Sequence, residues 1–275
     1  MTATLGDVRL RIDGPKLWTL SGFDYRDAMI ATPESAYGTV LNIRDVGILG
    51  SAHFLNVPGQ PGKVEKELVS SVRFWVDEQR VTQIMPTMNV TGASFRMERE
   101  SQIRAVEVQS SVMVRDGVLM ETARLRSQEA IDLKVTYPLM YAWSPTMTDY
   151  LFGDEQGVQK RGQFLKDAGK PNEGLEKSAR WMAVFDSQQG LGAVCCLVER
   201  PANAEAWLQY TDAPGVYRKL RIMSFSEQTL PAGFEGTYRA AIGFFQATPE
   251  NWEGIAMSRQ QELQTLAAVP ATARP

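Results

Sequence analysis

The chain has 275 residues, a formal net charge of -3 at pH 7 and a hydrophobic fraction of 44%. The slight acidity disfavours a nucleic-acid partner, which usually meets a basic face, and no apolar run approaches the roughly 18 residues of a membrane span. The length allows one body with a large buried core, so we expect residues 1–270 to form a single domain and residues 271–275 a disordered tail.

The N-terminus and the cysteines bear on the compartment. Residues Met1 to Asp7 lack the basic region and apolar core of a signal peptide. Cys195 and Cys196 are the only cysteines, and adjacent residues in a strand point to opposite faces, which disfavours a disulfide between them. We expect two buried thiols in a reducing, cytoplasmic protein, or a secreted or periplasmic one if a signal peptide has been removed.

The N-terminal third of the chain has the pattern of short strands separated by turns. The segment from Asn56 to Gly62 contains two prolines and two glycines, which predicts an exposed loop. The strands expected on either side of this loop cover residues 7–12, 16–20, 36–44, 46–50, 66–76 and 79–85.

Residues 93–143 carry the clearest pattern, because polar and apolar side chains alternate through successive runs. This alternation is typical of strands with one face on a core and one face in water. Gly117 ends a turn at Arg115-Asp116-Gly117, since glycine tolerates the positive φ of a hairpin. We expect a meander of long antiparallel strands over residues 93–103, 104–114, 118–127 and 130–143.

The last of these runs is rich in aromatic residues. Alternation places Tyr137, Leu139, Tyr141 and Trp143 on one face of the strand. An aromatic face on a large antiparallel sheet is well suited to bind a sugar ring by stacking.

After residue 143 the pattern changes. Five glycines interrupt residues 144–178, which predicts a long loop, either a functional one or a partly ordered excursion. A helix is expected after Thr248 and Pro249, which suit a cap and a first turn, and it should pack on the exterior or an edge of a sheet. Its apolar stripe consists of Trp252, Ile255, Ala256, Leu263 and Leu266, and the strands before it cover residues 179–186, 191–199, 204–210, 216–225 and 235–246. The predicted fold class is all-β, a large antiparallel two-sheet supersandwich with a C-terminal helix.

Two segments carry a resemblance to a known superfamily. The run from Thr229 to Arg239 leads into an apolar strand, and the segment from Ser35 to Leu41 is rich in small residues. The first is similar to the entry into the last long strand of the galactose mutarotase-like superfamily, and the second is similar to its opening strand. The resemblance implies a supersandwich whose concave face binds carbohydrate. The superfamily includes aldose and sugar-phosphate epimerases and domains of polysaccharide lyases and glycoside hydrolases.

The chain departs from the epimerases of this superfamily. These enzymes typically use two histidines and a late glutamate, whereas this chain has one histidine, His53, and no carboxylate between Tyr217 and Met223. The resemblance therefore supports a sugar-binding sheet but argues against an epimerase of the usual kind.

Several residues could support chemistry on a sugar acid. His53 or Tyr141 could transfer the proton in a β-elimination, and Arg44 or Arg180 could neutralise the substrate carboxylate. Arg218 and Lys219, which follow Tyr217, are further candidates for this carboxylate contact. The alternative for His53 is a loop histidine bonded to backbone, and the alternative for each cation is a solvated surface side chain.

Trp143, Tyr137 and Tyr150 are the predicted substrate-binding residues, with core packing as the alternative for the aromatic rings. Asp149, Asp154 and Glu155 match no recognised calcium loop, and the chain has no glycine-rich nucleotide fingerprint. We predict no metal and no cofactor.

The sequence predicts a carbohydrate-active protein, most concretely a polysaccharide or oligosaccharide lyase acting by β-elimination on a sugar acid. Its partner would be an oligosaccharide or polysaccharide, with neither nucleic acid nor membrane, and the oligomeric state stays open. The alternatives are a non-catalytic carbohydrate-binding or structural module, an assembly subunit, and a glycoside hydrolase or epimerase on the same fold. A deep concave groove in which His53, a tyrosine and an arginine converge within hydrogen-bond reach would favour an enzyme, whereas a shallow aromatic shelf without that convergence would favour a module.

Overall fold

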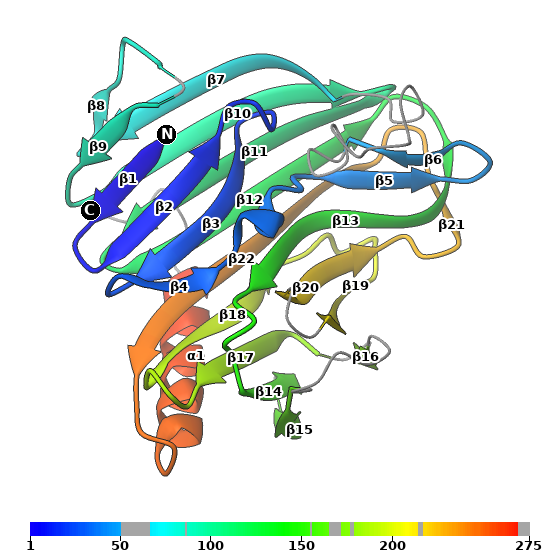
Figure 1. Cartoon of the computed structure of the whole chain (residues 1–275). Helices are drawn as coiled ribbons and strands as arrows, with labels where there is room; N and C mark the ends of the chain where they lie inside the picture. The colour runs from blue at the N-terminus through cyan, green and yellow to red at the C-terminus, as the bar shows by residue number, and fades with distance from the viewer. Residues whose placement is uncertain are drawn as a thin grey trace.

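The computed structural model describes residues 1–50, 67–85, 87–154, 156–164, 172–176, 179–213 and 217–268. Within these residues two large sheets face each other (Figure 1), and every strand pair is antiparallel except that between β1 and β9. The twelve-stranded sheet contains β1 (Thr2–Leu5), β2 (Val8–Asp13), β3 (Thr19–Tyr25), β4 (Ala28–Ala31), β5 (Val40–Ile43), β6 (Gly47–Leu49), β9 (Asn89–Thr91), β13 (Ile131–Trp143), β16 (Asn172–Glu176), β19 (Ala206–Ala213), β20 (Tyr217–Ser224) and β21 (Gln228–Leu230).

The ten-stranded sheet lies behind it in Figure 1 and carries the long strands of the alternating region. Its strands are β7 (Leu68–Val76), β8 (Gln79–Arg80), β10 (Phe95–Ile103), β11 (Val106–Arg115), β12 (Val118–Ser127), β14 (Asp149–Asp154), β15 (Gly157–Gln163), β17 (Trp181–Asp186), β18 (Leu191–Glu199) and β22 (Glu235–Gln246). The predicted all-β, two-sheet class is confirmed, since 61% of the residues that the structure describes lie in strands and 8% are helical.

The main core lies between the sheets and follows from the alternation along each strand. In β10, for example, the odd-numbered residues from Phe95 to Ile103 are buried, while the even-numbered residues between them are more exposed. Phe23 of the facing sheet packs edge-on against Trp143 and Phe244, with ring centroids 5.9 and 5.7 Å apart. One hydrophobic cluster therefore spans both sheets.

The helix α1 (Trp252–Ala268) covers the exterior of the ten-stranded sheet, where it contacts β17, β18 and β22 (Figure 1). Trp252 stacks on Phe185 at 5.2 Å, and Ala256 and Leu263 are also buried. The exterior position is the one expected from the sequence, although Leu266 is 45% exposed.

The predicted four-stranded meander is wrong in its last member. Strands β10, β11 and β12 are neighbours in the ten-stranded sheet, but β13 crosses to the other sheet and pairs with β20, β5, β21 and β4. Alternation along one strand identifies a buried face but does not select the partner strand.

The predicted long loop at residues 144–178 is also wrong in part, because it contains β14, β15 and β16. Two of its glycines lie in strands beside large rings. A Cβ at Gly153 would lie 2.4 Å from the Trp181 ring, and one at Gly162 would lie 2.6 Å from the Tyr150 hydroxyl oxygen. These glycines therefore make room for aromatic side chains and do not end the strands.

Strand β13 contains an extra residue that changes which side chains share a face. Its pairing with β20 shifts between Thr136 and Leu139, as in a β-bulge. Leu139, Tyr141 and Trp143 belong to the core between the sheets, whereas Tyr137 packs on the opposite side of the sheet. The prediction that Tyr137 shares their face is therefore wrong.

Candidate functional site

The candidate site lies on the face of the twelve-stranded sheet that points away from the ten-stranded sheet, here called the outer face. Strands β13, β20 and β19 lie side by side there (Figure 1). Register places Lys219 between Ala142 and Thr211, and Arg221 between Met140 and Gln209. We define the outer-face cluster as Tyr37, Tyr137, Trp207, Gln209, Lys219 and Arg221.

Period-two alternation in β20 brings its cations to this face. Leu220 and Ile222 are fully buried in the core between the sheets, so Lys219 and Arg221 point the other way. Both cations are half-buried. A single strand thereby supplies two neighbouring positive groups to one surface.

The ammonium group of Lys219 is held against Tyr37. Its Nζ donates a hydrogen bond of 2.7 Å to the Tyr37 hydroxyl oxygen and lies 3.9 Å from the centre of the ring. Burial lowers the pKa of Lys219 to about 7, with a further lowering from the Arg221 charge and an opposing effect of Glu34. The amine is therefore partly neutral near pH 7, as a general base requires.

Arg221 extends the cluster toward β19. Its guanidinium carbon lies 5.4 Å from the centre of the Tyr137 ring, and Nη2 donates to the Thr211 hydroxyl at 2.5 Å. Beside it, the Gln209 side-chain oxygen is buried and has no hydrogen-bond partner in the described part of the chain. This oxygen could accept a hydrogen bond from a ligand.

Apolar side chains of the same face pack around the polar groups. Trp207 packs with Val135 and Met223, and Tyr37 packs with Val40 and Met140. Tyr137, which is half-buried, contacts both groups and joins them.

A short 3-10 turn, η1 (Pro33–Ser35), fixes Tyr37 beside β13. The backbone N–H of Thr32 donates to Ala142 O at 2.7 Å, and the N–H of Ala142 donates to Ser35 Oγ at 2.9 Å. Gly38 follows with a φ of +63°, where a Cβ would lie 2.9 Å from the Thr19 methyl group. The turn therefore has little freedom to move Tyr37 away from Lys219.

Most of the side chains predicted from sequence lie elsewhere. Tyr141 and Trp143 are fully buried between the sheets, with ring centroids 5.8 Å apart, and Tyr150 is 6% exposed with its hydroxyl 3.4 Å from that of Tyr210. For these three, the core-packing alternative describes their position, and none of them reaches the outer face.

Arg44 and Arg180, the predicted catalytic cations, are also separate from the cluster. Arg44 is exposed and pairs with Glu227 at 2.8 Å. Arg180 is half-buried at the start of β17 and donates to the carbonyl of Ala179 at 3.1 Å. His53 lies outside the described residues. Of the predicted site residues, the outer-face cluster contains Tyr137, and it also contains Lys219, the further candidate for a carboxylate contact.

Sequence reasoning missed Tyr37, Trp207, Gln209 and Arg221 as site residues. Lys219 and Arg221 occupy the polar positions of an alternating strand, which looks the same as an ordinary wet face. Tyr37 lies within the segment that carries the superfamily resemblance, which is the one signal that could have drawn attention to it.

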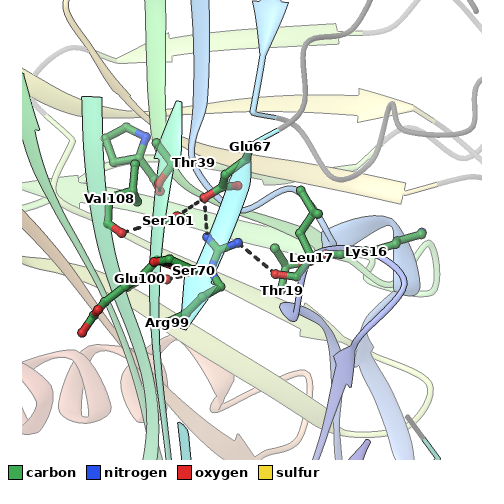
Figure 2. A network of polar contacts seen from close by, with 12 residues as sticks. Lys16, Leu17, Thr19, Thr39, Glu67, Ser70, Arg99, Glu100, Ser101 and Val108 are labelled. Carbon is green, nitrogen blue, oxygen red and sulfur yellow. Dashed lines mark hydrogen bonds and ion pairs between the residues drawn. The ribbon is translucent and has the colours of Figure 1, made fainter. Parts of the chain in front are cut away.

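A second polar network is buried between the sheets, as Figure 2 shows. Arg99 pairs with Glu67 at 3.1 Å and donates to the carbonyl of Leu17 and to Ser110 Oγ at 3.0 Å each. The Ser101 hydroxyl donates to the same Glu67 carboxylate. The side chains of Arg99 and Glu67 are 2% and 0% exposed, so this network is closed to solvent.

Glu121 and Tyr141 extend this interior region. Burial raises the pKa of Glu121 to about 7, opposed by the Tyr141 hydroxyl and by the charge of Arg99. The Tyr141 hydroxyl is close enough to have this effect, although it makes no hydrogen bond of regular geometry. Burial, followed by the nearby Glu121, raises the pKa of Tyr141 well above its usual value, so this tyrosine is a poor proton-transfer group at neutral pH.

Among the described residues, no group of three or more histidine, cysteine, aspartate or glutamate side chains could hold a metal ion. No helix in the same part of the chain is long and apolar enough to cross a bilayer.

Comparison with solved structures identifies the fold. The galactosidase domain of the alpha-galactosidase-sucrose kinase AgaSK matches with a TM-score of 0.53 and 9% identity over 90% of this chain and 40% of that one. Alpha-N-acetylgalactosaminidase NagBb from Bifidobacterium bifidum, in complex with GalNAc, matches with a TM-score of 0.52 and 11% identity over 94% of this chain and 39% of that one. The predicted galactose mutarotase-like fold is confirmed.

The match to a putative aldose 1-epimerase from Escherichia coli K12 has a TM-score of 0.47 and 11% identity, and it covers 89% of this chain and 98% of that one. The chain spans about 40% of the length of the two proteins above. No family model and no curated protein matches the chain.

Proposed function

We propose that the protein is carbohydrate-active and that its outer-face cluster binds a sugar acid and cleaves it by β-elimination. The observation that carries this proposal is the position of two cationic side chains on strand β20. Nζ of the half-buried Lys219 lies 2.7 Å from the Tyr37 hydroxyl oxygen, and Arg221 neighbours it on the same face of the strand. This arrangement combines a proton acceptor and a carboxylate-binding cation on one surface.

Each requirement of the reaction has a matching group. The proton next to a carboxylate is removed by a base, and Lys219 has a pKa of about 7, so a large share of it is neutral at physiological pH. Arg221 would bind the carboxylate and stabilise the negative charge that develops on it. The ring of Tyr137 and the free oxygen of Gln209 would contact the sugar ring and a hydroxyl.

The fold supports a carbohydrate as the ligand. The matched structures are named as a galactosidase domain and an N-acetylgalactosaminidase bound to GalNAc. The guanidinium group of Arg221 favours an acidic sugar over a neutral one, because a carboxylate complements its charge.

The test is a screen of oligosaccharides that contain uronic acids against neutral ones, following both the ultraviolet absorbance of unsaturated products and the release of reducing ends. We expect absorbance to rise with uronic-acid substrates only. Lys219→Met should lower kcat/KM by about 10²- to 10⁴-fold, whereas Lys134→Met, at an exposed lysine of β13, should leave it unchanged.

Three results would contradict this proposal. Reducing ends without absorbance would indicate hydrolysis, and binding without any product would indicate a carbohydrate-binding module. Equal loss of activity in the two lysine variants would show that Lys219 has no special part.

A further inference from the structure

We propose that Lys219 both takes the proton from the substrate carbon and returns it to the leaving oxygen, so that the site acts on hexuronates whose C5 hydrogen and C4 oxygen lie on the same face of the ring. This inference rests on the proposed function and adds the stereochemistry of the substrate.

The first step of the argument is the fixed position of the nitrogen. Nζ of Lys219 is hydrogen-bonded to the Tyr37 hydroxyl and lies against the Tyr37 ring. Tyr37 is itself 3% exposed and held through η1 to β13. The amine can therefore approach a ligand only from the side turned away from Tyr37, and so it meets one face of a bound sugar ring.

The second step concerns the other groups beside Lys219 in the part of the chain that the structure describes. Arg221 serves the carboxylate, because a guanidinium group offers only N–H donors, and Tyr37 is too buried to reach a substrate atom. Tyr37 is accordingly a positioning residue that orients the amine. Glu34 influences Lys219 electrostatically and is the carboxylate to test as a second proton-transfer group.

Lys219 alone can then carry out both proton transfers of the reaction. The C5–H bond breaks and its proton joins the lone pair of the neutral amine. The electron pair of that bond forms the C4=C5 double bond, and the C4–O bond breaks with its pair on oxygen. The ammonium of Lys219 then gives its proton to that oxygen and becomes an amine again. One nitrogen can serve both atoms only if the hydrogen and the oxygen are cis.

The test compares two substrates that differ only at C5, a 4-O-linked glucuronate with the cis arrangement and a 4-O-linked iduronate with the trans arrangement. We expect kcat/KM to favour the cis substrate by at least about 100-fold, the lower end of what a positioned proton-transfer group contributes. Equal activity on both, or activity on the trans substrate alone, would overturn the inference while leaving the lyase function in place. Inactivity on every uronate would overturn both.

Variants give an independent readout. Lys219→Ala should lose activity and regain part of it with added methylamine, which can fill the space and carry the proton, whereas Arg221→Ala should not respond to the amine. Tyr37→Phe should shift the pH dependence of kcat, as expected for a residue that orients the base. Failure of methylamine to restore Lys219→Ala, or inactivation by Glu34→Gln as complete as that by Lys219→Ala, would overturn the inference.

Discussion

The two polar clusters lie on opposite sides of the twelve-stranded sheet and differ in what surrounds their charges. Arg99 is 2% exposed, and its guanidinium group already bonds a carboxylate, a hydroxyl and a backbone carbonyl. Lys219 and Arg221 are half-buried and keep part of their surface open. The difference indicates that the interior network holds the sheets together, whereas the outer-face cluster is available to a ligand.

The largest expected effect tests this contrast directly. Arg99→Met removes the partner of the buried Glu67 carboxylate, which should lower the free energy of unfolding by about 3–5 kcal/mol. Arg221→Met, the matched change on the outer face, should cost less than about 1 kcal/mol because solvent reaches that side chain. Urea unfolding of both variants measures the two values, and similar losses would remove the distinction between the clusters.

The next largest expected effect is a pH dependence of folding stability that comes from the buried Glu121. The pKa of Glu121 is raised to about 7 from 4.5, so the folded state binds more protons than the unfolded state between these values. The stabilisation from this group is complete below about pH 4.5 and is lost as pH rises through about 7. Glu121→Gln should remove this loss and be more stable than wild type at pH 8, by on the order of 3 kcal/mol at most.

That measurement is a series of urea unfolding curves from pH 5 to pH 8. A wild-type protein whose stability does not fall over this range, or a glutamine variant that falls equally, would show that Glu121 is ionised throughout.

The smallest expected effect is the pH dependence of stability that comes from Lys219 on the outer face, and its sign is opposite to that of Glu121. The pKa of Lys219 is lowered to about 7 from 10.5, so the unfolded state binds more protons between these values and stability rises with pH there. Lys219→Met should remove that rise and be more stable than wild type at pH 7. We expect a gain of up to about 1 kcal/mol, because solvent screens a half-buried group. A loss of stability would mean that the ammonium is well satisfied in the folded state and unsuited to act as a base.

The sequence predicts the class of the fold better than its details. Alternation identifies most strands, and the helix after Pro249 follows from its cap and its apolar stripe. The partner of β13 could not be predicted, because pairing depends on which sheet offers a free edge and not on the strand alone. The strands hidden among the glycines of residues 144–178 were missed because room for Trp181 and Tyr150 is a property of the packed sheet.

The site was harder to predict for a related reason. One extra residue at the bulge near Pro138 reverses the direction of Tyr137 relative to Tyr141 and Trp143, and a strict period of two cannot anticipate it. Large aromatic side chains near a strand end look the same in sequence whether they face a core or a ligand. The cations of β20 become significant only when η1 brings Tyr37 against Lys219.

The bulge in β13 has a consequence for how this protein can change. It divides one aromatic stretch into a part before Pro138 that faces outward and a part after it that fills the interior. Mutations at Tyr137 can therefore alter ligand preference during evolution without disturbing the interior that Tyr141 and Trp143 fill. For the same reason, an engineer who wishes to install a new specificity should vary Tyr137 and keep Tyr141 and Trp143.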